Sequence, residues 1–225
     1  MQVAISLSKP YSILNHSELQ AFDKWFGKSV LRNSDGTPKV VYHGSPASFD
    51  KFKKEFIGNG EDAYGIGLYF TDRPDWAQGY TGTNGNIMPV YLKITKPIIY
   101  EKQPRMTYTQ AWKIAMGLGA EHFREFLGQN YDLDYMGVRA ATREYLEAYD
   151  GQDVVIGGNN LFIDIYQHNP KSYTFADVFA KAVNRDGIIS KRGKDHFYVV
   201  FSPTQIKSSV GNKGTFKPRS GNVID

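Results

Sequence analysis

Three short stretches of the chain carry residue types that can do chemistry. The first is Tyr-His-Gly-Ser at 42–45, and the second is Gly-Ile-Gly-Leu-Tyr-Phe-Thr at 65–71. The third is Tyr80, which follows Tyr69 by eleven residues. A histidine ring hydrogen-bonds, a glycine leaves its backbone N–H and C=O bare, and tyrosine faces stack on flat or cationic rings. Taken singly, each also fits an ordinary strand-end histidine, turn glycine or core aromatic.

The flanking sequence places these stretches at strand ends and on a short helix. Residues 39–42 and 67–71 have the character of short strands, and the Gly-rich residues 56–66 between them form a loop. Asp-Arg-Pro at 72–74 opens a helix that runs to about Tyr80, because proline suits the first helical turn. The two strands and the helix therefore have to bring the three stretches together.

The remainder of the chain predicts a helix first, then strands, then a largely helical region. Apolar spacing indicates a helix over 17–30, with Ser17 as its N-cap. Gly-Gly-Asn-Asn at 157–160 indicates a turn. The other expected helices are 108–118, 121–127, 134–149 and 175–184; the expected strands are 90–94, 98–100, 186–190 and 197–201, with 153–158 and 161–165 as short strands or buried loop.

In order and spacing, these motifs resemble the ADP-ribosyltransferase fold of the diphtheria-toxin and poly(ADP-ribose) polymerase type. Closer still is the phage and prophage branch found in polyvalent and head-associated proteins. Its signatures are matched by Trp-Phe-Gly at 25–27, Val-Val-Tyr-His-Gly at 40–44 and Tyr-Val-Val-Phe-Ser-Pro-Thr-Gln-Ile-Lys at 198–207. The resemblance covers about residues 18–210 and is poorest over 101–183.

The resemblance implies an α+β fold in which two small antiparallel sheets form an NAD+ cleft. It implies one ADP-ribosyltransferase-like domain over 1–225, with a core, a helical insertion and two arms. The core is 17–100 and 184–210, the insertion 101–183, and the arms 1–16 and 211–225.

The resemblance also assigns roles to the three stretches. NAD+ would be the co-substrate, and its flat, cationic nicotinamide would lie between the faces of Tyr69 and Tyr80. His43 would bond a ribose hydroxyl, and His43 and Tyr69 are the expected catalytic residues. The expected NAD+-binding residues are His43, Gly44, Ser45, Tyr69, Phe70 and Tyr80, with the loop 57–63, including Glu61 and Asp62, over the adenosine half.

One departure from the family concerns the catalytic carboxylate. Many active relatives carry a glutamate at the start of the last catalytic strand, where this chain has Phe197, or His196 or Tyr198 if the alignment slips. Asp195 is the nearest acid, and Gln205 lies eight residues beyond the expected place. A glutamate of the insertion, such as Glu144 or Glu147, is a further alternative.

A second departure is Ala77, where polymerase-type relatives carry serine. The two gaps argue against chain elongation. They leave single ADP-ribose transfer, NAD+ hydrolysis or NAD+ binding without turnover.

Composition excludes several other classes of protein. The 225 residues contain no cysteine, which excludes a disulfide scaffold, a thiolate nucleophile and a Cys-ligated metal. The five histidines are scattered, so no metal ligand or cofactor other than NAD+ is expected. No apolar run is long enough to span a bilayer, and no membrane partner is expected.

Charge is unevenly distributed around a net +4. Residues 185–219 hold eight Lys or Arg against two Asp, whereas 121–153 hold eight acids against three bases. The basic end suits either a solvated tail or a phosphate-rich partner.

The sequence therefore favours a mono-ADP-ribosyltransferase that acts on a host protein or nucleic acid, with the insertion as the place of acceptor recognition. It is expected in the cytoplasm of the host cell and in the virion before delivery. A catalytically silent NAD+-binding or virion component of the same fold is the alternative, and a basic RNA-binding module is a third hypothesis.

Overall fold

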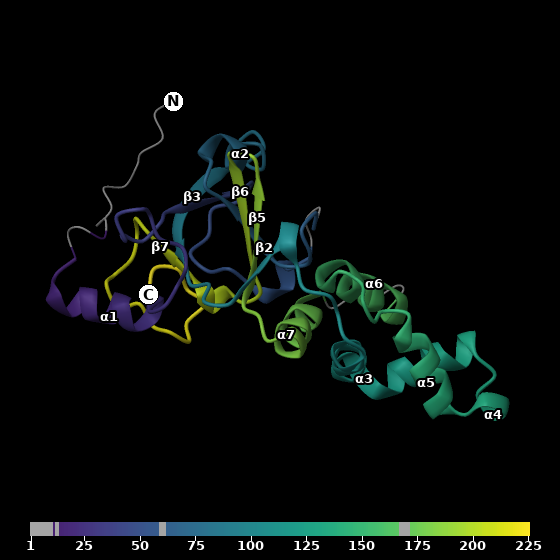
Figure 1. Ribbon diagram of the computed structural model, residues 1–225. Coiled ribbons are helices and arrows are strands. Elements are labelled where there is room, and N and C mark those ends of the chain that lie inside the picture. The colour runs from purple at the N-terminus through teal and green to yellow at the C-terminus, as the bar shows by residue number, and fades with distance from the viewer. Residues whose placement is uncertain (1–10, 12–13, 59–61, 167–171) are drawn as a thin grey trace.

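A single mixed sheet of seven strands forms the centre of the computed structural model, which describes residues 11, 14–58, 62–166 and 172–225 (Figure 1). The strand order is β4-β5-β6-β2-β1-β3-β7, and the described pairings are antiparallel except that of β4 with β5. The strands are β1 Val41–Ser45, β2 Leu68–Thr71, β3 Asn86–Leu92, β4 Pro97–Ile99, β5 Gly187–Arg192, β6 Asp195–Val200 and β7 Ile206–Ser208.

The sheet consists of two well-paired halves that meet at one point. Tyr42 with Thr71 is the one described residue pair between β1 and β2. In contrast, five pairs join β1 to β3 and four join β2 to β6. The expectation of two separate antiparallel sheets is thus corrected to one mixed sheet. Strand patterns in a sequence reveal neither a single joining pair nor the parallel partner of β4, because both are long-range contacts.

The helices come from two parts of the chain. Among the described residues, α1 and α2 belong to the first hundred residues, and α3 to α7 lie between β4 and β5. The helices are α1 His16–Phe26, α2 Pro74–Gln78, α3 Tyr108–Asn130, α4 Leu133–Met136, α5 Val138–Glu147, α6 Val154–Tyr166 and α7 Ser172–Val183, and the 3₁₀ turns are η2 Lys54–Phe56, η3 Tyr100–Lys102 and η4 Pro203–Gln205.

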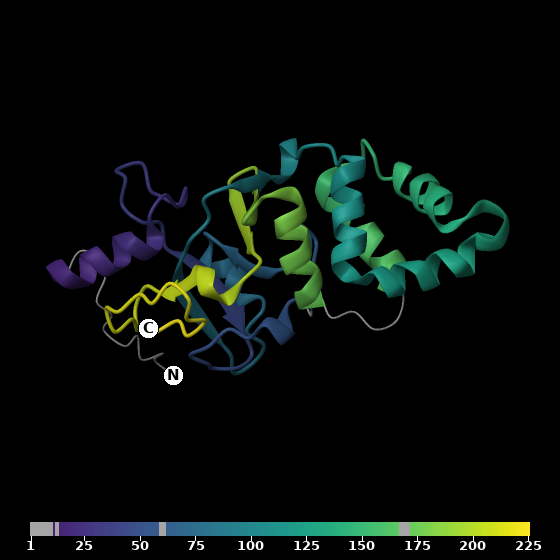
Figure 2. The same cartoon turned by 90° about the horizontal axis from the view of Figure 1, so that it is seen from below.

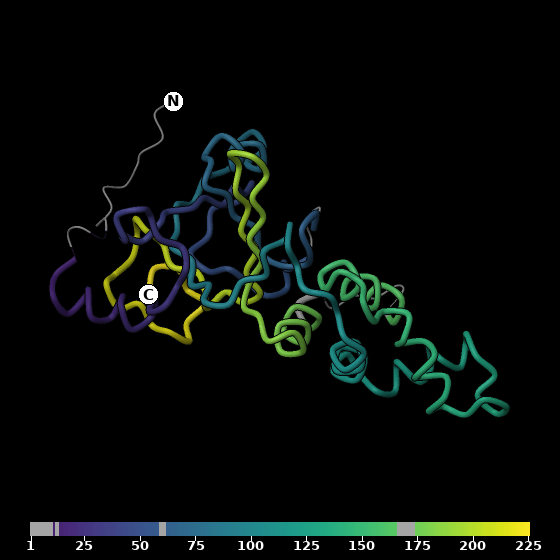
Figure 3. Tube along the Cα trace, viewed as in Figure 1, coloured from purple at the N-terminus to yellow at the C-terminus, as the bar shows by residue number. Residues whose placement is uncertain are grey.

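The helical region serves as the crossover between the two parallel strands. The chain leaves the sheet after β4 and returns at β5, as the trace in Figure 3 shows. Parallel neighbours always need such a connection, because the chain has to travel back before it can pair. In Figures 1 and 2, α7 lies between the sheet and the other helices of this region. The rings of Phe179 in α7 and Phe201 after β6 meet at 5.8 Å, which couples the two layers.

The structure corrects several of the expected elements. The expected helix 134–149 is divided into α4 and α5 at Gly137, and the expected helix 17–30 ends at Phe26. Residues 153–158 and 161–165, expected as strands or buried loop, lie almost entirely in α6, and so does the expected turn at 157–160. Gly157 and Gly158 are there for packing: a Cβ would lie 2.7 Å from Met106 Cε and 2.5 Å from a ring carbon of Phe179, respectively. The sequence misled because paired glycines favour turns unless a neighbouring element needs the space.

A second apolar cluster joins α1 to the C-terminal end of the chain. The side chain of Asn15, not Ser17 as expected, caps α1 by accepting a hydrogen bond from the Glu18 amide. Phe22 of α1 lies edge-on to Phe216 at 5.0 Å, and Phe216 is only 2% exposed. Part of the stretch 211–225 is therefore packed into a core in the described structure.

Candidate functional site

His43 lies just beyond the pair that joins the two halves of the sheet. Its Nδ1 is 2.8 Å from the backbone oxygen of Tyr69. Because a carbonyl only accepts hydrogen bonds, this nitrogen carries the proton and donates it. Burial beside Phe52 and Phe70, whose rings lie 5.0 and 5.4 Å away, lowers the pKa of His43. The ring is therefore neutral at pH 7 and keeps Nε2 as a hydrogen-bond acceptor, the group that a sugar hydroxyl needs.

Two hydrogen bonds hold the hydroxyl group of Tyr69 in place. The hydroxyl donates to the Gly65 backbone oxygen at 2.6 Å and accepts from the Tyr64 amide at 2.9 Å. Burial raises its pKa, so the phenol stays protonated over the physiological range. The loop before β2 thus occupies the hydroxyl. What remains for a ligand is the ring, which is oriented by these two bonds.

Gly44 allows α2 to approach β1 at close range. A Cβ on this residue would lie 1.8 Å from the backbone oxygen of Ala77 and 3.2 Å from Tyr80 Cβ. No side chain fits there, so glycine is required for the packing as well as for a bare backbone. The ring of Tyr80, just after α2, is 55% exposed. It lines a hollow of about 420 Å³ on α2 together with Asp75, Trp76 and Gly79.

Strand pairing places three predicted residues on one face of the sheet. Because Tyr42 and Thr71 are partners, Gly44 and Tyr69, each two residues further on, point to the same side. Tyr80 contacts Gly44 on that side. We refer to this surface, defined by Gly44, Tyr69 and Tyr80, as the aromatic face.

The other predicted residues lie elsewhere around β1 and β2. His43 and Phe70 alternate onto the opposite side, where Phe70 is 2% exposed and packs beneath the His43 ring. Ser45 is 8% exposed, and its Oγ accepts from the Ala47 amide at 3.2 Å. Phe70 in β2 and Ser45 at the end of β1 thus have structural contacts, and their contact with a ligand stays a prediction. Gly60 and Glu61 of the loop 57–63 lie outside the described residues.

Aromatic rings occupy the place expected for a glutamate. Phe197 in β6 pairs with Thr71, so it shares the aromatic face. Its ring stacks on Tyr64 and meets Trp76 edge-on, both at 5.3 Å. Phe197 is thus part of a hydrophobic wall between the loop before β2 and α2.

Most of the residues that were considered in place of the missing glutamate make structural contacts. His196 Nδ1 bonds Asp72 at 2.6 Å, and Asp195 accepts from Arg73 at 2.8 Å. The Gln205 side-chain amide bonds four backbone groups, which lie just after β6, just after β3 and just before β5; these bonds agree with a structural role. Tyr198 is 3% exposed in the core, and Glu147 pairs with Arg143 on α5.

Glu101 is a carboxylate that sequence reasoning missed. It follows β4, and its Oε1 accepts from Ser190 Oγ at 2.6 Å and from the Lys191 amide at 2.7 Å. Ser190 is the partner of Phe197 across the β5–β6 ladder. Glu101 therefore lies one strand away from the expected glutamate. Only the parallel pairing of β4 with β5 brings it there, and no local signal in the sequence reveals that pairing.

Asp62 is a half-buried carboxylate with one shielded oxygen. Its Oδ1 has no contact with solvent and no hydrogen-bond partner among the described residues. Burial raises its pKa to about 6, although a hydrogen bond from the Gly67 amide opposes the shift. Its charge also acts on the nearby Tyr69 hydroxyl. A group of this kind is costly to the fold and is common at functional sites.

Gly44→Ala is expected to destabilise the protein by about 2–3 kcal/mol, because the new methyl group overlaps the Ala77 carbonyl and displaces α2. Urea unfolding measures this effect without any ligand. Gly211→Ala is the matched control, since its Cβ meets nothing closer than 3.6 Å. Equal stability of the two variants would contradict the close approach of α2.

Asp62→Asn is expected to stabilise the protein at pH 8 by about 1–2 kcal/mol, less than a fully buried group with this pKa would give. The folded state binds the Asp62 proton more tightly than the unfolded chain does. Ionisation therefore costs stability above pH 6, and this cost vanishes below the ordinary pKa of 3.8. Unfolding curves of both proteins at pH 4 and pH 8 measure the difference. A gain that does not grow with pH would refute the raised pKa.

Two classes of site find no support in the described part of the chain. Residues 11, 14–58, 62–166 and 172–225 contain no cluster of three or more histidine or acidic side chains suited to a metal ion. None of the helices formed by these residues has the length and apolar character that crossing a membrane requires.

Comparison with known proteins identifies the family. Residues 33–216 match the family described as ADP-Ribosyltransferase in polyvalent proteins. No curated protein and no solved structure matches the chain at a significant level. The match covers well over half of the 225 residues, and it includes His43, Gly44, Tyr69 and Tyr80. Membership implies ADP-ribosyltransferase activity with NAD+ as co-substrate. The chain therefore belongs to the ADP-ribosyltransferase family of polyvalent proteins.

Proposed function

We propose that the protein binds NAD+ on the aromatic face and transfers a single ADP-ribose to a macromolecule of the host. The observation that carries this proposal is the exposed ring of Tyr80, held beside Gly44 on the same side of the sheet as Tyr69. A cationic nicotinamide ring is attracted by the faces of two tyrosines, and such contacts are worth about 1–2 kcal/mol when partly desolvated. Beyond Tyr42, the edge of β1 that faces β2 has no described pairing partner in β2. The backbone groups along this edge are therefore suited to hydrogen bonds with a carboxamide.

His43 supplies the second part of the proposed NAD+ site. Its Nδ1–H is committed to Tyr69, so the neutral ring presents Nε2 in a fixed orientation. An acceptor nitrogen of this kind suits a ribose hydroxyl. Because His43 lies on the side of the sheet opposite to the aromatic face, the sugar would have to reach it through the gap where β1 and β2 part. Catalysis then depends on positioning and on stabilising positive charge as the glycosidic bond breaks.

The proposed reaction exchanges one bond at C1 of the ribose. The C1–N bond of NAD+ breaks, and its electron pair leaves with neutral nicotinamide. A nucleophilic atom of the acceptor forms the new bond to C1 and releases a proton. We assign the carboxylate that supports the developing cation to Glu101, whose Oε1 is held by Ser190 and Lys191.

Single transfer fits the structure better than chain elongation does. Phe197, flanked by Tyr64 and Trp76, replaces the glutamate on which elongation relies in the family. The host acceptor is a protein or a nucleic acid, and the site of action is the host cytoplasm after expression or delivery with the virion. The occurrence of the family in polyvalent proteins supports this phage context.

Binding of NAD+ without turnover is the second candidate function. It is favoured by one observation: at the start of β6, Phe197 is part of a hydrophobic wall, and Asp195 and His196 are held by Arg73 and Asp72. In that case the aromatic face would bind the dinucleotide, and no carboxylate would act on it.

Tyr80→Ala is expected to weaken NAD+ binding about tenfold, because one aromatic face is lost. Tyr80 is exposed, so the variant should fold normally. Calorimetric titration with NAD+ measures the affinity, and nicotinamide release with and without host lysate measures turnover. Tyr135→Ala is the control, since it removes a tyrosine that is 91% exposed on α4.

The outcomes separate the two functions. Lysate-dependent release that falls in Tyr80→Ala supports transfer, whereas affinity without release under any condition supports binding alone. If wild type and Tyr80→Ala bind NAD+ equally, or neither binds it, the aromatic face is not the NAD+ site.

Glu101→Gln is expected to lower nicotinamide release at least tenfold while NAD+ affinity changes less than twofold. The amide keeps the shape of the side chain but not the negative charge that opposes the developing cation. Asp195→Asn is the control, because Asp195 is already engaged by Arg73. Loss of release in the control but not in Glu101→Gln would reverse this assignment.

A further inference from the structure

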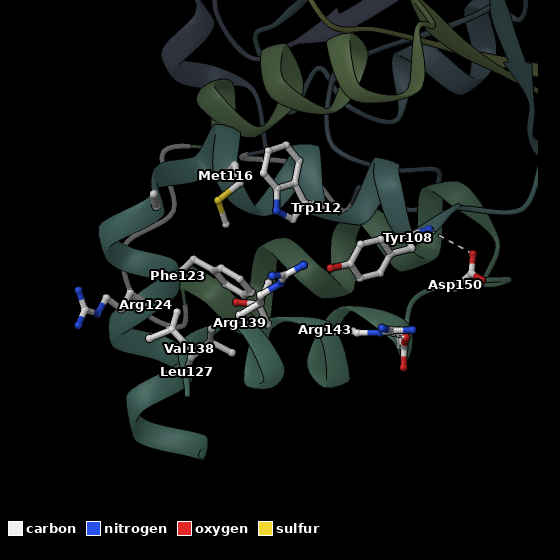
Figure 4. Close-up of a pocket in the computed structure, with 13 residues that line it drawn as sticks. Tyr108, Trp112, Met116, Phe123, Arg124, Leu127, Val138, Arg139, Arg143 and Asp150 are labelled. Atoms are coloured by element: carbon white, nitrogen blue, oxygen red, sulfur yellow. Dashed lines mark hydrogen bonds and ion pairs between the residues drawn. The ribbon is translucent and has the colours of Figure 1, made fainter. Parts of the chain in front are cut away.

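The helical insertion contains a groove of about 840 Å³ between α3 and α5 (Figure 4). The helices α3 and α5 lie beyond α7 as seen from the sheet (Figure 1), so the groove between them is separate from the aromatic face. Its floor is apolar and includes Met116, Phe123 and Leu127. Trp112 and Val138 on its walls remain 45% and 38% exposed.

Both helices present a stripe of side chains to this groove. On α3 the lining residues recur every three or four positions from Tyr108 to Leu127, on both sides of a kink at Gly119. On α5 they recur from Val138 to Glu147. Two such stripes on facing helices form a groove that can accept the apolar face of a third, amphipathic helix.

The arginines of the segment 121–153 are gathered at this groove. The segment 121–153 has three basic residues, and all three line the groove: Arg124, Arg139 and Arg143. Arg143 bonds Glu147 at 2.7 Å. Arg124 and Arg139 are exposed, and neither forms an ion pair with another described residue. The Arg139 guanidinium therefore lies beside the apolar floor, and the Arg124 side chain extends from the outer edge of the groove (Figure 4).

The acids of the same segment lie mostly outside the groove. Glu147 and Asp150 line it, whereas six others do not, namely Glu121, Glu125, Asp132, Asp134, Glu144 and Asp153. A long polyanion such as a nucleic acid would meet these charges as soon as it extended past the arginines. A short ligand with apolar side chains and a few carboxylates avoids them.

We propose that the α3–α5 groove binds an acidic amphipathic helix of a partner protein. The apolar side of that helix packs on Met116, Phe123 and Leu127, and its carboxylates pair with Arg124 and Arg139. Arginine is suited to this, because its guanidinium bonds a carboxylate through two parallel hydrogen bonds. Binding here does not require NAD+, so it stands apart from the proposed reaction.

The test is a selection from a phage-displayed library of random 16-residue peptides on the full-length chain. Enriched peptides are expected to carry net negative charge and apolar residues at i, i+3, i+4 and i+7. Synthesised with a fluorescent label, they should bind Arg124→Glu/Arg139→Glu at least tenfold more weakly than wild type by anisotropy. Lys113→Glu, a single charge reversal on α3 outside the groove lining, should alter affinity less than twofold.

Several results would overturn the proposal. They are no enrichment, enrichment of basic or non-amphipathic peptides, and equal binding to wild type and the double variant. A labelled 16-nucleotide RNA that binds wild type and is lost in the double variant, when no acidic peptide binds, would instead assign the groove to nucleic acid. Since both arginines are exposed, Arg124→Gln/Arg139→Gln serves as a second variant should the glutamates disturb folding.

Discussion

The meeting point of β1 and β2 is the constraint on which the rest of the site depends. One residue pair joins the strands, and the next bond across the gap comes from a side chain: His43 Nδ1 donates to the Tyr69 backbone oxygen. The two halves of the sheet are thereby held together without a continuous ladder. The same divergence exposes the strand edges beside Gly44, where α2 packs at a distance that only glycine permits.

This arrangement explains which parts of the site the sequence could reveal. The strand positions of His43, Gly44 and Tyr69 were predictable because a strand end and a glycine before an aromatic strand are local patterns. The short helix before Tyr80 was predictable from its proline. The contact of these residues with NAD+ stays a prediction. Their proximity was predictable only through the resemblance to a family, because the pairing of Tyr42 with Thr71 joins distant parts of the chain.

Other features were beyond local patterns. Glu101 owes its position to the parallel pairing of β4 with β5, which depends on about ninety residues of intervening chain. The helical state of Gly157 and Gly158 depends on Met106 and Phe179, which fill the space that side chains would need. The net charge of the insertion was countable in the sequence, but the gathering of its arginines at one groove depends on how α3 and α5 pack.

The order of the strands also sets the order in which a nascent chain can fold. β2 is flanked by β1 on one side and by β6 on the other, and β6 is made of residues 195–200. Until residues 195–200 have left the ribosome, β2 therefore keeps an open edge. Closing so long a loop has an entropic cost and slows assembly. During synthesis, the insertion can fold first as a helical unit of local contacts, and its completion then delivers β5 and β6 to the waiting edges of β4 and β2.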